Sequence, residues 1–133
     1  MARERFAPDD PREWLNRAFS NLARAREALE DVYLEDLCFD AQQAAEKALK
    51  AVLIKHGVAF PYVHDLDQLL ELVEQALSGI PEEVQAAGLL TRFAVVTSYP
   101  GAIGVVTRAD HKDALATADA VVRWAEEQLS ERA

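Results

Sequence analysis

The chain has 133 residues, of which 50% are apolar and 28% are charged, and its formal net charge is −9. This length predicts a single domain, 1–133, and the apolar fraction is enough for a core, which excludes a chain that is disordered as a whole. No run approaches the ~18 apolar residues of a membrane span, and the first ten residues contain no apolar signal segment. Cys38 is the only cysteine. We therefore expect a cytoplasmic protein that contacts no membrane and has no internal disulfide.

The charge and the composition also limit the partners and the fold class. Acidic residues outnumber basic ones by 23 to 14 and no basic arm is present, which argues against binding to DNA but leaves room for a local nucleotide pocket. Alanine occurs 24 times, whereas glycine and proline occur five times each. This usage predicts an all-α protein, because alanine is the best helix former and glycine and proline are the worst.

The first predicted helix begins at Asp10-Pro11 and runs to about Tyr33. Asp10 can cap it, Pro11 suits the first helical position, and Glu13 stands at the spacing of a capping box. Apolar residues then recur every three or four positions, which predicts one buried face.

The second predicted helix covers about residues 34–56 and ends at Gly57, a residue suited to a helix C-terminus. Its apolar residues cover a wide arc of the circumference, so we expect it to be buried on more than one side. The second side faces either the centre of the bundle or a partner chain.

Three further helices are predicted after an apolar loop at 57–64. The third begins at Asp65 and stops at Ser78-Gly79, the fourth runs from Pro81 to about Thr97, and the last begins at Thr107 and Asp110. Together the elements predict an antiparallel, up-and-down bundle of about five helices around a four-helix-bundle core.

The densest polar pattern lies in the second helix. Gln42, Glu46 and Lys50 are spaced four apart and form one ridge, beside which lie Gln43 and Lys47. A structural interpretation makes this a solvated ridge with an ion pair between Glu46 and Lys50. Gln42, however, lies at the edge of the apolar arc, where a buried amide needs partners. The alternative interpretation is a surface for a ligand or an interface.

The histidines give no metal pattern, and the sequence indicates no catalytic residue or cofactor. In a structural interpretation Asp65 caps the third helix and His64 packs against the loop or hydrogen-bonds to it, whereas in a functional one His64 faces an anion at that helix start. His56 and His111 stand at other element ends, and we expect His111 in a solvated first turn. Cys38 falls on an apolar face, which predicts a buried, inert thiol.

The string FDAQQAAEKALKAVLI at 39–54, followed by His64-Asp65-Leu66 and by Ser98-Tyr99-Pro100, resembles the HEPN domain family. The resemblance covers about residues 12–130. It implies a helical bundle that forms a homodimer, binds a nucleotide, and pairs with a minimal nucleotidyltransferase, in many cases as a toxin–antitoxin system. Some branches of the family are metal-independent ribonucleases with an arginine followed four to six residues later by a histidine.

The chain departs from this ribonuclease pattern. Ser98 stands where relatives carry arginine, and Arg108 precedes His111 by only three positions. We therefore predict a non-catalytic HEPN subunit. The alternatives are a ribonuclease toxin with a rearranged site across a dimer and a plain helical interaction module. The candidate ligand or interface residues are Gln42, Gln43, Glu46, Lys47, Lys50, His64, Asp65 and Tyr99.

Overall fold

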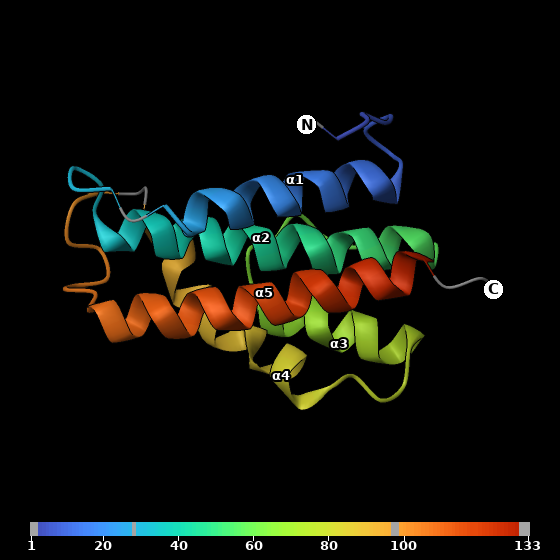
Figure 1. The fold of residues 1–133 in the computed structure, drawn as a ribbon. Helices are drawn as coiled ribbons and strands as arrows, with labels where there is room; N and C mark the ends of the chain where they lie inside the picture. The colour runs from blue at the N-terminus through green and yellow to red at the C-terminus, as the bar shows by residue number, and fades with distance from the viewer. Residues whose placement is uncertain (1–2, 28, 97–98, 131–133) are drawn as a thin grey trace.

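A computed structural model describes residues 3–27, 29–96 and 99–130. Within these ranges the chain contains helices and no strand, which confirms the predicted all-α bundle (Figure 1). The elements are, in chain order, α1 (Pro11–Ala25), α2 (Leu34–Lys55), α3 (Leu66–Ala76), α4 (Glu82–Gln85), the 3-10 helix η1 (Ala86–Val95) and α5 (Arg108–Ser130). None of the helices that these residues form is both long and apolar enough to cross a membrane.

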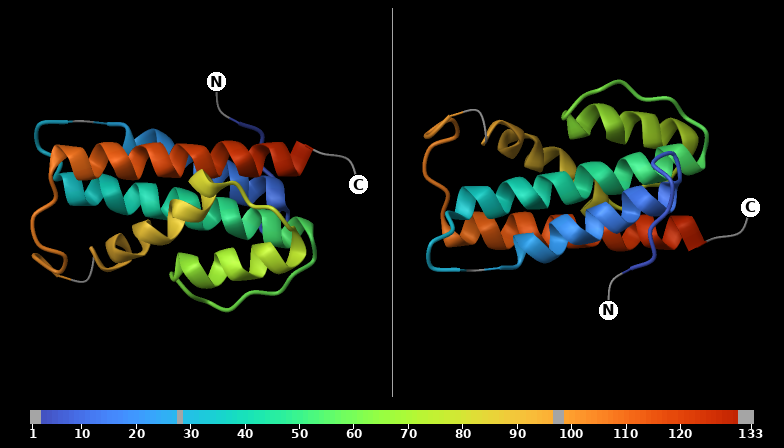
Figure 2. Two further views of the ribbon diagram at one scale, coloured as in Figure 1. Left: turned by 90° about the horizontal axis from the view of Figure 1, so that it is seen from below. Right: turned by 90° about the horizontal axis from the view of Figure 1, so that it is seen from above.

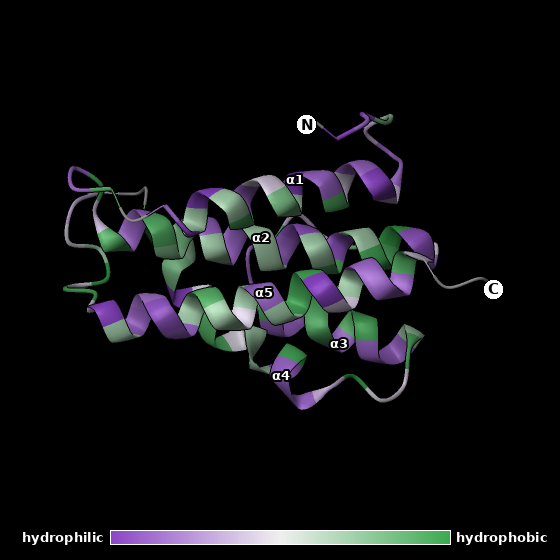
Figure 3. Cartoon of the chain, in the orientation of Figure 1, coloured by the Kyte–Doolittle hydropathy of each residue, from purple (hydrophilic) through white to green (hydrophobic). Residues whose placement is uncertain are grey.

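Helix α2 is the centre of the bundle. It packs against α1, α3, η1 and α5, and α1 and α5 also pack against each other (Figures 1 and 2). The wide apolar arc of α2 is therefore covered within one chain, and of the two predicted explanations the structure shows the bundle centre. Along α1 and α5, hydrophobic and hydrophilic residues alternate in bands, as expected for helices with one buried face (Figure 3).

Small side chains allow the helices to approach α2 closely. Five of its alanines are completely buried, namely Ala41, Ala44, Ala45, Ala48 and Ala51. Larger apolar side chains from the surrounding helices fill the space, among them Leu22, Leu66, Phe93 and Val122. The core is consequently dense around α2, where an added methylene group would meet packed atoms.

Segment 57–65 changes the direction of the chain after α2. It runs back along the bundle, so that α3 begins beside the middle of α2 and then extends in the same direction as α2 (Figure 2). The backbone oxygen of His64 lies 3.5 Å from Nε2 of Gln42. The start of α3 is thereby placed against the polar ridge of α2.

Three helix starts have the predicted caps. Asp10 accepts a hydrogen bond from the backbone N–H of Arg12 at 2.9 Å, and Asp65 accepts one from Asp67 at 3.0 Å. At α5, Thr107 and Asp110 exchange backbone-to-side-chain hydrogen bonds reciprocally, which is a complete capping box.

Glu13 does not complete a capping box with Asp10, contrary to the spacing argument. Its Oε1 instead accepts a hydrogen bond from the backbone N–H of Phe6 at 2.9 Å, because the N-terminal segment folds back onto α1. A second correction concerns the end of α1, which lies at Ala25 and not near Tyr33. Nε2 of His111 in α5 lies 2.7 Å from the Ala25 carbonyl oxygen and donates to it. If α1 continued, the Ala25 carbonyl would accept a hydrogen bond from a backbone N–H of the next turn. In this structure it accepts from His111 instead.

The fourth predicted helix is shorter and tighter than expected. Only Glu82–Gln85 is α-helical, and the chain continues as the 3-10 helix η1 to Val95, while the predicted end at Thr97 lies outside the described residues. Gly88 in η1 lies against the carboxylate of Asp67 in α3, where a Cβ would overlap an oxygen of that side chain. Because Asp67 is exposed, its side chain would have to turn away to make room for any other residue at this position.

Candidate functional site

The predicted ridge of α2 forms a buried chain of hydrogen bonds. Nε2 of Gln42 donates to Oε1 of Glu46 at 2.9 Å, and Nζ of Lys50 donates to Oε2 of the same carboxylate at 2.9 Å. Gln42 is completely buried, and Glu46 and Lys50 are 4% and 5% exposed. The interpretation of these three residues as a solvated ridge is therefore wrong, because the chain folds over them.

Segment 57–65 and α1 provide the cover over Lys50. Its Nζ lies 5.5 Å from the ring centroid of Phe60 and 5.9 Å from that of Trp14. The two rings meet edge to face, with centroids 6.1 Å apart. The ammonium group is thus held between a carboxylate and two aromatic side chains, an arrangement in which the ion pair and the aromatic rings both favour its charge.

His64 joins this network from the start of α3. Its Nδ1 lies 2.9 Å from Oε1 of Glu46 and donates to it, while the His64 side chain is 68% exposed. Asp65 is exposed and is occupied as the cap of α3. Asp65 caps α3 as expected, whereas His64 bonds to Glu46 of α2 and not to the loop. Its exposed side chain leaves the anion-facing interpretation a prediction.

The electrostatics keep Glu46 ionised in its buried position. Burial raises the pKa of Glu46, but the hydrogen bonds from His64, Lys50 and Gln42 together outweigh burial and hold the pKa below its ordinary value. A carboxylate with three donors has no proton to give at neutral pH. Its oxygens are also occupied, so this group is suited to holding helices together and not to acid–base chemistry.

Lys47 belongs to a second polar cluster, between α1 and α2. Its Nζ donates to Oδ1 of Asn21 at 2.7 Å, and Nδ2 of Asn21 donates to Oδ1 of Asp40 at 3.0 Å. Arg24 lies 3.5 Å from the same carboxylate. Desolvation lowers the pKa of Lys47, partly offset by the charge of Glu46. Sequence reasoning missed Asn21, although an amide between Ala18, Leu22 and Ala25 on an apolar face is a visible signal for a buried polar contact.

The remaining predicted residues are not assembled into one site. Gln43 is half-buried and donates to Oε1 of Gln42 at 2.7 Å. Tyr99 lies in the loop before α5, shares no contact with the α2 ridge or His64 in the described structure, and is 66% exposed. With Tyr33 it lines a hollow of about 390 Å³. Ser98 lies outside the described residues.

Cys38, His111 and a possible metal site are the other places where the sequence could carry chemistry. Cys38 is buried as predicted, and desolvation raises the pKa of its thiol to about 11, so the thiolate is scarce at neutral pH. His111 is half-buried against Ala25 and not in a solvated turn as expected. In the part of the chain that the structure describes, no three His, Cys, Asp or Glu side chains gather as metal ligands.

Comparison with known proteins supports this architecture. Residues 11–128 match the family model of the HEPN domain. The crystal structure of TT1696 from Thermus thermophilus is similar with a TM-score of 0.73 and 29% identity, covering 89% of this chain and 97% of that one. The structure of ST0689, an archaeal HEPN homologue, has a TM-score of 0.66 and 24% identity, covering 91% of this chain and 98% of that one. No curated protein is significantly similar to the sequence.

Proposed function

Because this chain belongs to the HEPN domain family, we propose that it is a non-catalytic HEPN subunit that forms a homodimer and pairs with a minimal nucleotidyltransferase. In this role, similar to that of a toxin–antitoxin component, it contributes a nucleotide-binding surface and performs no bond cleavage itself. The pairing and the nucleotide come from the family resemblance, and the non-catalytic character comes from the geometry of the polar residues.

One observation carries the non-catalytic part: the polar side chains that the sequence places at the centre are buried and partnered. Glu46 receives three hydrogen bonds, and among the described residues no buried side-chain nitrogen or oxygen lacks a partner. A catalytic centre needs a group free to bind substrate and exchange a proton. Gln42, Glu46 and Lys50 offer none, since their contacts fix α2, α3 and segment 57–65, and His64 is the one member of this network with an exposed side chain.

The histidine in the alternative ribonuclease arrangement is also engaged. Nε2 of His111 donates to the carbonyl oxygen of Ala25, which holds the ring against the end of α1 and leaves Nδ1 as the nitrogen that could accept a proton from a ribose hydroxyl. Cleavage of a phosphodiester needs both a free proton-transfer group and a nearby cation. This geometry supports a structural role for His111 at the end of α1.

Exposed apolar side chains at one end of the bundle support the homodimer part. The loop between α1 and α2 and the loop before α5 meet there (Figure 1), and they carry Leu29, Tyr33, Tyr99 and Val105, which are 60%, 74%, 66% and 91% exposed. Exposed apolar groups gathered in one place are typical of protein–protein contact sites. We place the contact between two copies at this end.

Light scattering of the purified chain tests this proposal. We expect a dimer, which the double substitution Tyr33→Ser with Tyr99→Ser converts to monomer, because the apolar contact is lost. Tyr62→Ser is the matched control: Tyr62 is a fully exposed tyrosine in segment 57–65, away from that end. A monomeric wild-type chain, or equal effects of both substitutions, contradicts the proposed interface.

Two further measurements test the partner and the absence of catalysis. A minimal nucleotidyltransferase encoded beside this chain, expressed with it, should co-purify with it in a fixed ratio. Incubation of the chain with RNA in a chelator should leave the RNA intact. Metal-independent cleavage that His111→Ala abolishes would instead establish the ribonuclease alternative.

A plain interaction module is the second candidate, and the burial of the α2 ridge favours it, because Gln42, Glu46 and Lys50 expose almost nothing to a ligand. The two candidates differ in ligand binding. A thermal melt with and without a nucleoside triphosphate separates them: a concentration-dependent rise in melting temperature supports the HEPN subunit with a nucleotide, and no rise supports the plain module.

A further inference from the structure

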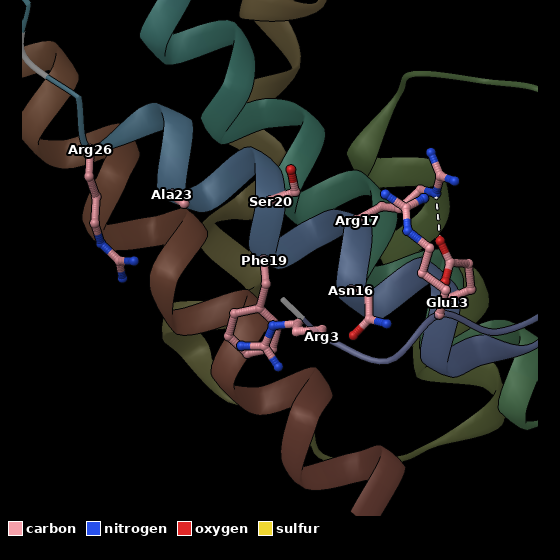
Figure 4. A pocket seen from close by; sticks show the side chains of 9 residues that line it. Arg3, Glu13, Asn16, Arg17, Phe19, Ser20, Ala23 and Arg26 are labelled. Carbon is pink, nitrogen blue, oxygen red and sulfur yellow. Dashed lines mark hydrogen bonds and ion pairs between the residues drawn. The ribbon is translucent and has the colours of Figure 1, made fainter. Parts of the chain in front are cut away.

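A basic hollow of about 450 Å³ lies along the outer face of α1, away from the α2 network (Figure 4). Side chains from two segments line it: the N-terminal segment before α1, and the solvent face of α1 itself. The lining residues, which we call the α1 hollow, are Arg3, Arg5, Glu13, Asn16, Arg17, Phe19, Ser20, Ala23 and Arg26.

Side chains of α1 hold the N-terminal segment in place as one wall of the α1 hollow. Nδ2 of Asn16 donates to the backbone oxygen of Glu4 at 2.6 Å, and Glu13 accepts from the backbone N–H of Phe6 at 2.9 Å. Nε1 of Trp14 donates to the backbone oxygen of Pro8 at 2.8 Å. These three contacts turn the segment back along the helix and bring Arg3 and Arg5 beside the basic residues of α1.

The α1 hollow concentrates positive charge in an acidic protein. Its lining contains four arginines and one glutamate, whereas the whole chain has a formal charge of −9. The single carboxylate, Glu13, is already occupied, since the backbone N–H of Phe6 and the side chain of Arg17 both bond to it. The hollow can therefore attract an anion, although the chain as a whole is negatively charged.

The arginines keep hydrogen-bond donors available. Arg17 is bonded to Glu13 through Nε at 2.9 Å, and Arg26 to Asp119 of α5 through one terminal guanidinium nitrogen at 2.7 Å. Their side chains remain 60% and 47% exposed. Arg3 lies over the Phe19 ring, with 3.8 Å from its guanidinium carbon to the ring centroid. A guanidinium has five N–H donors, so each of these groups retains several for a ligand.

From this geometry we infer that the α1 hollow binds a ligand with two or three adjacent phosphate groups. Arginine forks bind phosphate oxygens through paired hydrogen bonds, and Asn16 and Ser20 add neutral donors between the charged groups. The volume suits a small molecule of nucleotide size. The inference rests on the nucleotide part of the proposed function and assigns it a place, on α1 and not on the α2 ridge.

Two single substitutions form a matched pair for the test. Arg26 and Arg123 each bond to Asp119, at 2.7 Å and 2.9 Å, but only Arg26 lines the hollow. Each substitution, Arg26→Gln or Arg123→Gln, removes one positive charge and one exposed ion pair with the same partner. Calorimetric titration at low ionic strength with inorganic tripolyphosphate, with ATP and with adenosine measures the result, and circular dichroism checks folding.

We expect tripolyphosphate and ATP to bind and adenosine not to bind. Arg26→Gln should weaken tripolyphosphate binding about tenfold, the effect of losing one charge-assisted hydrogen bond, and Arg123→Gln by less than about twofold. Substituting Arg3 and Arg5 together by Gln should weaken it further without touching a helix. If ATP and tripolyphosphate bind with equal affinity, the hollow recognises the phosphates alone. If ATP binds more tightly, the hollow also contacts the nucleoside. Both outcomes support the inference.

Other outcomes overturn it. Equal weakening by Arg26→Gln and Arg123→Gln means that the ligand responds to net charge and not to the hollow. ATP binding that none of the hollow substitutions changes places the nucleotide elsewhere, which overturns the inference and leaves the proposed function intact. If neither ATP nor tripolyphosphate binds, both the inference and the nucleotide part of the proposed function are wrong. The homodimer and the pairing are tested separately, by light scattering and co-purification. Single-stranded RNA binding more than about tenfold tighter than ATP excludes a small-molecule site.

Discussion

The α2 network and the α1 hollow are both rich in charged residues, yet the chain uses them in opposite ways. In the α2 network Glu46 and Lys50 are about 5% exposed and bonded to each other, to Gln42 and to His64. In the α1 hollow, Arg17 and Arg26 are about half exposed, and each uses few of its N–H donors in bonds within the chain. A polar group whose partners all lie in its own chain serves the fold, and one with donors to spare can serve a ligand.

The largest effect that separates the two regions is expected for Glu46→Ala. Removing this carboxylate leaves the ammonium of Lys50 and the amide of Gln42 buried without their acceptor, which should lower the free energy of unfolding by about 3 kcal/mol. Urea denaturation measures it, with Glu71→Ala on the exposed side of α3 as the control. A loss no larger than that of the control would show that the network does not stabilise the bundle.

A smaller loss is expected for Asn21→Ala, in the cluster between α1 and α2. Without the amide, Nζ of Lys47 and Oδ1 of Asp40 each lose a hydrogen bond, and we expect about 2 kcal/mol less stability in the same denaturation experiment. Asn16→Ala is the matched control on the exposed side of α1, where the amide bonds only to the backbone of Glu4. Equal losses would mean that burial of the amide contributes nothing.

The pH dependence should also distinguish the α2 network. The pKa of Glu46 in the folded chain lies below its ordinary value, so the unfolded chain binds a proton at Glu46 at a higher pH than the folded chain does. The stabilisation from Glu46 is therefore complete above the unfolded value of about 4.3 and is lost as the pH falls from there through the lowered folded pKa. The stability difference between wild type and Glu46→Gln, measured from pH 7 to pH 3, should be constant at first and then shrink. A difference that grows with acidity contradicts this sign.

The smallest effect is expected in the α1 hollow. Without ligand, Arg26→Gln should change the free energy of unfolding by less than about 0.5 kcal/mol, because its ion pair with Asp119 is exposed. Thermal denaturation measures this change beside the same substitution at Arg123. A loss as large as that at Asn21 would mean that the hollow, like the α2 network, serves the fold, and the contrast between the two regions would disappear.

Local patterns in the sequence were enough to predict the class of the fold and most helix starts. Asp10, Asp65 and Thr107 act on neighbouring residues, so their roles as caps follow from spacing alone. The end of α1 could not be predicted in this way, because His111 reaches Ala25 from 86 positions along the chain. The change from the short α4 to the 3-10 helix η1 was not predicted either.

The candidate sites show the same limit. The spacing of Gln42, Glu46 and Lys50 correctly placed them on one ridge, but the cover over Lys50 comes from Phe60 and Trp14 in other segments, which spacing cannot predict. The α1 hollow was missed because residues 1–30 contain six acidic and six basic residues. Their net charge is zero, and only the folding back of the N-terminal segment brings Arg3 and Arg5 into the same hollow as Arg17 and Arg26.

The central position of α2 has a consequence for how the bundle opens. Its amide protons are surrounded by four other elements, so they can exchange with solvent only when most of the core separates. Helix α3 rests mainly on α2 and η1 and begins from an exposed segment, so it can detach at a lower cost. In deuterated water, α2 should therefore retain its protons longest and α3 should lose them early, although the bond between His64 and Glu46 opposes the detachment of α3.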